Sequence, residues 1–136
     1  MKERYVIVPI GYVRSSVRDK GEAPRQGRDE EFEAVLEILE EYAAAIEGIR
    51  GWDVLQVICW MHLASRDILQ VHPQGDPTRP LTGVFGTRSP ARPNPLAGYT
   101  VELVNLEGLK LTVRGIDAVD GTPVVDIKPH IRRLDD

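Results

Sequence analysis

The alternation of apolar and polar residues around a Glu107-Gly108 turn most constrains how this chain can fold. Residues 100–119 read TVELVNLEGLKLTVRGIDAV, and the apolar positions that define the alternation are Val101, Leu103, Leu109, Leu111 and Val113. A period of two is typical of half-buried strands. Two such runs joined by a tight turn predict a β-hairpin.

Other segments add strands and turns to this hairpin. Residues 5–16 (YVIVPIGYVRSS) and 54–64 (VLQVICWMHLA) are rich in β-branched and aromatic residues, so each predicts a strand. TGVFGT at 82–87 predicts a short strand, and DGTPVVDI at 120–127 predicts a turn leading into a last one. Residues 72–82 hold three prolines and a glycine, which indicates a loop.

The acidic segment at 31–51, EFEAVLEILEEYAAAIEGIRG, fits two periods. Apolar residues fall at helical spacing along it, but its first half also alternates glutamate with apolar residues as a strand does. Alanines 43–45 and the stop at Gly48 favour a helix for the second half only. Many short strands with one helix at most indicate an all-β barrel or sandwich, and 136 residues suit a single domain at 1–136.

Charge and composition limit the possible functions. The net charge of −4 argues against a general nucleic-acid coat, although residues 77–101 carry three arginines and no acid. That segment forms either an electropositive patch or a solvated face without a partner. The single cysteine, Cys59, lies in an apolar run and predicts a buried thiol. The absence of a signal peptide and of an apolar run of about 18 residues predicts a cytoplasmic protein that does not enter a membrane.

Several common catalytic patterns are absent from the sequence. No GxGxxG or GxxxxGK[ST] follows a strand, and no GxSxG nucleophile elbow occurs. The three histidines lie far apart, and one cysteine cannot build a structural zinc site. Dinucleotide binding on a Rossmann turn, hydrolytic chemistry and metal chemistry are therefore disfavoured.

The segment GTRSPARPNPLAG at 86–98 is too stiff for a flexible linker and too polar for a buried strand. Arg92 and Asn94 each precede a proline, which restricts their backbones before any ligand arrives. Arginine offers a fork of donors for a carboxylate or phosphate, and asparagine offers both a donor and an acceptor. The segment is either a preorganised binding loop or a rigid barrel corner in which Asn94 bonds its own backbone.

These segments together resemble the TrmO (YaeB-like, TsaA-like) family. GVFGTRSPARPNPLAG resembles the family pattern GVFATRSPxRPNPIGxS, and IGYVRSS, PRQG and VDGTPVVDIKPH resemble its IGxIRS, PRQ and DGTPVLDIKPY elements. The elements follow the family's order over residues 9–130. The resemblance implies a small β-barrel with one short helix, with a strand at 31–38 and the helix at about 40–48. It also implies S-adenosyl-L-methionine as the cofactor, without a Rossmann fold.

The family's best-known members methylate N6-threonylcarbamoyladenosine next to the anticodon of certain tRNAs, as dimers with the cofactor near the subunit interface. The resemblance therefore implies a homodimer acting on tRNA. By matching position, it places the cofactor against the PRQ loop, the end of the 54–64 strand, the stiff loop and the DGTP turn: Pro24, Arg25, Gln26, Met61, His62, Arg88, Gly98, Asp120, Gly121, Thr122 and Pro123. Arg92, Asn94, Asp126 and Lys128 match motif positions of less defined role.

The residues by themselves leave these assignments open. A lone histidine such as His62 is either a core residue or a proton acceptor, and the DGTP turn is either structural or ligand-binding. Asp126 and Lys128 are expected on one face of a strand. Asp126 and His62 are both able to act as the general base, and no catalytic residue is singled out.

The chain also departs from the family pattern. Ala97 and Tyr99 replace a glycine and a serine, and His130 replaces the tyrosine of DIKPY. The sequence ends at Asp136, before the C-terminal extension of longer members, which counts against tRNA as the acceptor. The remaining alternatives are a methyltransferase with a small-molecule acceptor and a non-catalytic protein that binds S-adenosyl-L-methionine.

Overall fold

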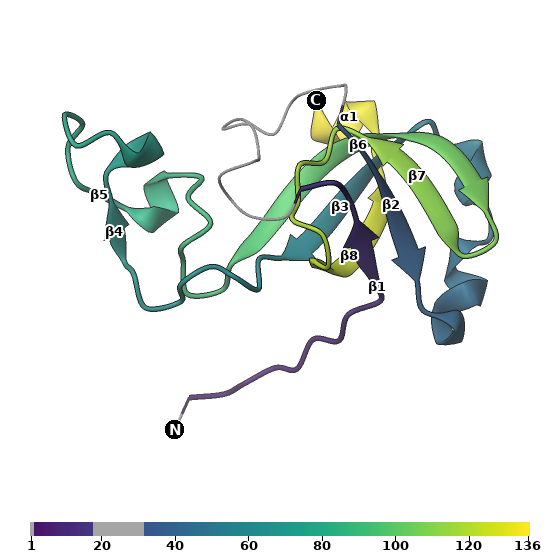
Figure 1. Cartoon of the computed structure of the whole chain (residues 1–136), viewed down its shortest axis with the longest axis horizontal. Helices are drawn as coiled ribbons and strands as arrows, with labels where there is room; N and C mark the ends of the chain where they lie inside the picture. Colours follow the sequence, from purple (N-terminus) through teal and green to yellow (C-terminus); the bar gives the residue numbers. More distant parts are fainter. Residues whose placement is uncertain (1, 18–31) are drawn as a thin grey trace.

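A computed structural model describes residues 2–17 and 32–136, and its central element is a closed barrel of six antiparallel strands. The strand order around the barrel is β1-β2-β7-β6-β3-β8 (Figure 1). The strands are β1 (Gly11–Arg14), β2 (Glu33–Ile38), β3 (Val54–Trp60), β6 (Leu96–Glu107), β7 (Lys110–Arg114) and β8 (Pro123–Pro129). The expected mainly β barrel is confirmed, and so is the hairpin, which β6 and β7 form.

The barrel encloses one apolar core. Strand β3 lies between β6 and β8 and alternates partly exposed with fully buried residues, so Leu55, Val57 and Cys59 point inward. Leu36 from β2 and Leu111 from β7 meet them in the same cluster. Cys59 is buried, as predicted. Period-two alternation thus fills the barrel with side chains from β3 and from strands elsewhere around the barrel.

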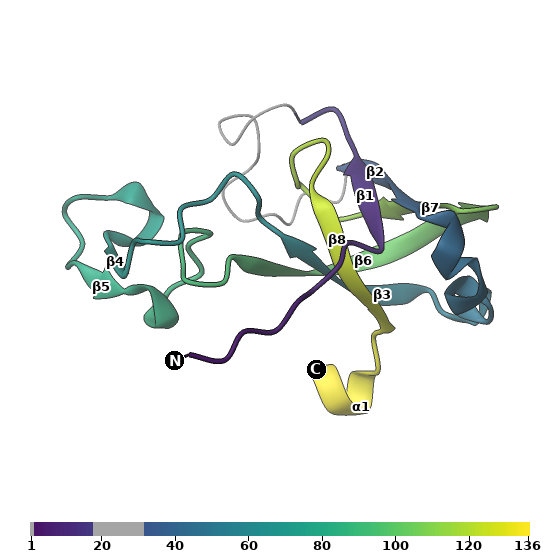
Figure 2. The same cartoon turned by 90° about the horizontal axis from the view of Figure 1, so that it is seen from below.

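A projection, defined here as residues 61–95, extends from the end of β3 to the start of β6. Its centre is a two-stranded sheet of β4 (Gln70–Val71) and β5 (Thr82–Gly83), which stands away from the barrel (Figures 1 and 2). Two 3₁₀ turns follow these strands, η4 (Pro73–Gly75) and η5 (Val84–Gly86). The predicted strand at 82–87 is therefore too long, because the chain turns at Val84.

The N-terminal strand is shorter than the predicted 5–16. Pairing starts at Gly11, which lies opposite Ile38 on one side and Val124 on the other. Within the described part of the chain no strand pairs with residues 2–9, and Tyr5 and Val6 are 85% and 89% exposed. In both views this segment runs away from the barrel (Figures 1 and 2). Residues 5–9 have the composition of a strand, but because no described strand pairs with them they form an extended arm.

The acidic segment contains both structures that its two periods indicated. Its first half is β2, and its second half is the 3₁₀ helix η2 (Glu40–Ile46), followed by η3 (Ile49–Gly51). A short α1 (Arg132–Asp135), which the sequence did not predict, follows β8. None of the helices in the described ranges is long and apolar enough to cross a bilayer.

Candidate functional site

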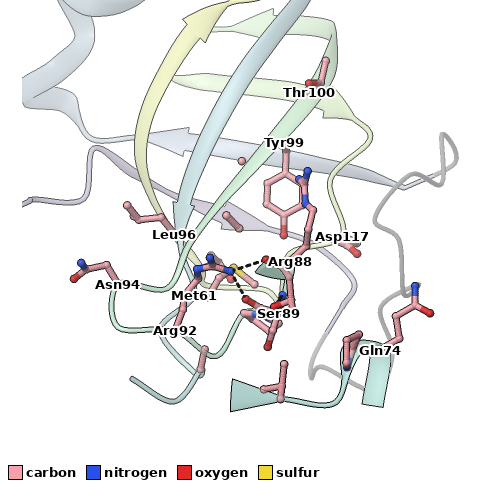
Figure 3. A pocket seen from close by; sticks show the side chains of 18 of the residues that line it. Met61, Gln74, Arg88, Ser89, Arg92, Asn94, Leu96, Tyr99, Thr100 and Asp117 are labelled. Atoms are coloured by element: carbon pink, nitrogen blue, oxygen red, sulfur yellow. Dashed lines mark hydrogen bonds between the residues drawn. The ribbon is translucent and has the colours of Figure 1, made fainter. Parts of the chain in front are cut away.

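A large open cavity of about 2480 Å³ lies between the barrel and the projection. Its lining includes the stiff loop at 86–98, the residues after β3, the first half of β6 and the segment before β8. Pockets for a single drug-sized ligand usually measure about 300–1,000 Å³, so this space has room for a cofactor and part of an acceptor. Figure 3 shows it from close by.

The stiff loop is fixed mainly by its own hydrogen bonds. The Thr87 hydroxyl donates to the Val84 carbonyl oxygen at 3.0 Å and accepts from the Ser89 amide at 3.2 Å. The Arg92 guanidinium Nη1 donates to the carbonyl oxygens of Thr87 at 3.2 Å and Ser89 at 2.9 Å (Figure 3). Arg92 therefore points back into its own loop and braces it.

A second arginine braces the loop from outside. Arg66 donates from Nε to the Pro93 carbonyl oxygen at 2.7 Å and from Nη2 to Asn94 Oδ1 at 3.2 Å. Its guanidinium carbon lies 5.0 Å from the centre of the Trp60 ring, which is cation–π distance. Asn94 is thus held by Arg66 through its side-chain oxygen. No motif in the sequence identified Arg66.

Arg88 differs from its neighbours because nothing in the described ranges engages its guanidinium by a hydrogen bond or ion pair. Its side chain is exposed and lines the cavity (Figure 3). An unengaged guanidinium on a fixed loop is suited to bind a carboxylate or phosphate.

Tyr99 and Asp117 form a polar pair where the barrel opens into the cavity (Figure 3). Tyr99 lies on β6 opposite Val57, and its ring packs against the core. A hydrogen-bonding interaction between its hydroxyl and the Asp117 carboxyl contributes to the pKa shifts of both groups. Burial raises the pKa of Tyr99 well above its usual range, and Asp117 raises it further. Burial also raises the pKa of Asp117, and the hydrogen bond from Tyr99 opposes that shift.

In the sequence Tyr99 stands out only as a departure from the family pattern, and no motif selects Asp117. The available signal was the alternation of β6, which places Tyr99 on the inward face together with Val101. A tyrosine at an inward position near a strand's beginning needs a polar partner. Its partner lies 18 residues further along the chain, which no local pattern reveals.

Met61 and His62 follow β3 and line the same cavity. The Met61 amide donates to the Pro95 carbonyl oxygen at 2.7 Å, which ties the end of β3 to the start of β6. His62 is exposed, so the alternative of a core histidine is wrong. Gly98 also lines the cavity, and apart from its two chain neighbours no atom of the described residues lies within 4 Å of the place where its Cβ would stand.

The polar side chains of the DGTP turn make hydrogen bonds within the protein, which indicates a mainly structural role. Asp120 Oδ1 accepts from the Ser15 amide at 2.9 Å, and the Thr122 hydroxyl donates to the Val119 carbonyl oxygen at 2.6 Å. Gly121 has φ +88°, which a glycine adopts without strain. Of the turn's four residues only Thr122 lines the cavity, while Asp120, Gly121 and Pro123 lie outside its lining.

Asp126 and Lys128 lie on one face of β8, as predicted, with Lys128 Nζ 3.9 Å from Asp126 Oδ2. They line a second cavity of about 410 Å³, together with Trp52 and Ile46, and not the large one. The two candidate bases are thus separated in this chain, since only His62 lines the large cavity. Pro24, Arg25 and Gln26 lie outside the described residues.

His130, which replaces the family's tyrosine, has partners at both ring nitrogens. Gln56 Nε2 lies 2.6 Å from Nδ1, and Asp136 Oδ1 lies 2.7 Å from Nε2. In the neutral ring, Nδ1 accepts from the Gln56 amide and Nε2–H donates to Asp136. His130 therefore holds the last residues of the chain against β3.

Comparisons with known proteins agree with the motifs. A family model described as the tRNA-methyltransferase O N-terminal domain matches residues 12–136. A probable S-adenosyl-L-methionine-binding protein of Methanothermobacter thermautotrophicus is 45% identical over 129 residues, which cover 95% of this chain and 92% of that protein. An S-adenosyl-L-methionine-binding protein of Archaeoglobus fulgidus is 42% identical over 130 residues, with 96% and 92% covered.

The fold is also similar to solved structures. The crystal structure of TrmO from P. aeruginosa matches with a TM-score of 0.81 and 32% identity, covering 100% of this chain. This chain spans only 59% of the length of that TrmO.

Proposed function

Because this chain belongs to the family of the tRNA-methyltransferase O N-terminal domain, we propose that it is an S-adenosyl-L-methionine-dependent methyltransferase. We further propose that the acceptor is the N6 nitrogen of threonylcarbamoyladenosine next to a tRNA anticodon. The names of the curated relatives, which are binding proteins of this cofactor, support the first part. The similarity to TrmO supports the second.

The observation that carries the proposal is the convergence of motif residues on one cavity. Arg88 from the stiff loop, Met61 and His62 after β3, Gly98 on β6 and Thr122 before β8 all line it. The cavity also has apolar surface from Met61 and Leu96 and polar groups from Arg88 and Asp117. This mixture fits a ligand that combines an adenine, a ribose and an amino acid.

The proposed role of each residue follows from the chemistry of its side chain. Arg88 would bind the cofactor's carboxylate, and the apolar side chains would cover the adenine. When bound, the cofactor supplies a methyl group already activated by its sulfonium, so the protein mainly aligns the reactants and excludes water. The acceptor nitrogen must lose a proton, and His62 is the candidate base that lines this cavity.

We also propose that the chain acts as a homodimer with sites shared between protomers. Asp126 and Lys128 match family motif positions, yet they line a different cavity from Arg88. A second copy placed against β8 would bring the two motif surfaces together. Light scattering tests the dimer. Mixed dimers of Arg88→Ala and Asp126→Asn protomers test the sharing, because only a shared site regains activity on mixing.

The deciding experiment incubates the purified protein with methyl-labelled S-adenosyl-L-methionine and one of three acceptors. These are tRNA carrying threonylcarbamoyladenosine, the same tRNA without the modification, and the free modified nucleoside. Label in the first tRNA alone supports the proposal, and labelling of the free nucleoside at an equal rate points to a small-molecule acceptor. Cofactor binding without S-adenosylhomocysteine formation would indicate a non-catalytic binding protein. Arg88→Ala serves as the variant that must lose cofactor affinity.

A further inference from the structure

The carboxylate of Asp117 is partly buried in the wall of the large cavity without a cationic partner. Among the described residues, no arginine, lysine or histidine forms an ion pair with it. The polar side chain that interacts with it is Tyr99, which lines the same cavity and contributes to the pKa shift of Asp117 through its hydroxyl. A carboxylate that loses water needs a charge partner or several donors to compensate, and one neutral hydroxyl compensates only in part.

Tyr99 supplies a second feature beside this carboxylate. Its ring packs on the core below, and its hydroxyl lies towards the cavity (Figure 3). Aromatic faces attract cations through their quadrupole, and a carboxylate next to an aromatic ring attracts them more strongly. The pair therefore forms an anionic corner in a cavity whose other lining includes the unengaged guanidinium of Arg88.

We propose that Asp117 binds a positively charged group of the cofactor, with Tyr99 as the residue that positions its carboxylate. This inference rests on the proposed function, which names S-adenosyl-L-methionine as the ligand. That ligand carries one carboxylate, which suits Arg88, and two cationic groups, the α-ammonium and the sulfonium. A cationic group at Asp117 would complete the compensation that Tyr99 begins.

Three ligands separate the possible contacts by calorimetric titration. S-adenosyl-L-methionine carries both cationic groups, S-adenosylhomocysteine carries only the ammonium, and 5′-methylthioadenosine carries neither while keeping the adenine and ribose. We expect Asp117→Asn to lower affinity for S-adenosyl-L-methionine at least about tenfold, since it removes one partner of a desolvated charge pair. Affinity for 5′-methylthioadenosine should stay within about twofold. S-adenosylhomocysteine follows the first ligand if Asp117 binds the ammonium and the second if it binds the sulfonium.

Tyr99→Phe keeps the ring and removes only the donor. Its affinity loss should be smaller but show the same ligand selectivity, because the carboxylate then loses its orientation and keeps its charge. Glu107→Gln, an exposed carboxylate on the hairpin turn outside both cavities, is the matched control and should change nothing.

The outcomes separate this inference from the proposed function. If folded wild-type protein does not bind S-adenosyl-L-methionine, the proposed function fails and this inference fails with it. If the wild type binds but Asp117→Asn weakens all three ligands equally, or none of them, only the role of Asp117 is refuted. Should Asp117→Asn fail to fold, the ligand selectivity of Tyr99→Phe decides, and an equal loss for all three ligands would count against the inference.

Discussion

Replacing Arg92 tests whether the stiff loop works by bracing or by direct contact with a ligand. Its guanidinium makes two charge-assisted hydrogen bonds, to the carbonyl oxygens of Thr87 and Ser89. In a partly buried setting each is worth about 1 kcal/mol net, so Arg92→Ala should weaken the closed loop by about 2 kcal/mol. The Arg92 amide keeps its bond to the Ser65 carbonyl oxygen, and the prolines keep their restraint.

This loss of about 2 kcal/mol limits how far Arg92→Ala can lower the affinity for the cofactor. A ligand that binds only the loop conformation held by these hydrogen bonds loses affinity in proportion to the fraction of molecules in that conformation. A loss of about 2 kcal/mol corresponds to roughly 30-fold at most. We therefore expect Arg92→Ala to lower cofactor affinity by about 5- to 30-fold. Arg88→Ala removes a direct contact and leaves these hydrogen bonds intact, so it should lower affinity without loosening the loop.

Hydrogen exchange and calorimetry together distinguish bracing from contact. In Arg92→Ala the amides of Ser89 and Ala91, which bond within the loop, should exchange faster, whereas in Arg88→Ala they should not. A bracing role for Arg92 is refuted if Arg92→Ala loses more than about 100-fold in affinity while hydrogen exchange in the loop is unchanged. Arg92 would then touch the ligand itself.

Three further predictions concern the stability of the barrel. A Cβ at Gly11 would overlap the Glu37 carbonyl oxygen, so Gly11→Ala should lower the free energy of unfolding by more than about 2 kcal/mol in urea, while exposed Gly83→Ala should not. Burial raises the pKa of the Cys59 thiol to about 12, so a disulfide reagent should modify it only as fast as the protein unfolds. Burial raises the pKa of Asp117, so the folded state holds its proton more tightly than the unfolded state and stability falls as pH rises through that pKa. Asp117→Asn should therefore be more stable than the wild type near neutral pH, and thermal melts should show this gain vanishing below the ordinary aspartate pKa of about 4. An equal gain at all pH values would contradict the assignment.

The sequence predicts the barrel because its strands carry their signal locally. The hairpin turn at Gly108 and the alternation before and after it were sufficient to predict β6 and β7. The strand predicted at 5–16 begins only at Gly11, because strand composition says nothing about whether a neighbouring strand exists to pair with residues 5–9. Strand β4 was missed and β5 was predicted too long, because strands of two residues contain no readable period.

The candidate site was predictable only where a motif is continuous in sequence. The stiff loop, Met61 and His62 could be selected in this way, and the structure places Arg88, Met61 and His62 on one cavity. The partners that hold the loop and the barrel mouth could not. Arg66 reaches Asn94 across 28 residues, and Asp117 meets Tyr99 from another segment, so both depend on tertiary structure.

In the stiff loop, the residues directly before prolines are held by hydrogen bonds, whereas Arg88 is not held in this way among the described residues. Arg92 and Asn94 stand directly before prolines, and both have partners within the protein, Arg92 in its own loop and Asn94 through Arg66. Arg88 precedes no proline and is the arginine of the loop left unengaged among the described residues. The hydrogen bonds of Arg92 and Arg66 and the three prolines therefore fix the loop from which Arg88 lines the cavity. Preorganisation of this kind reduces the entropy lost on binding, since the loop is ordered before the ligand arrives. In the same cavity, burial disfavours the charged form of Asp117 in the free protein, as it does for a group whose partner arrives with the ligand.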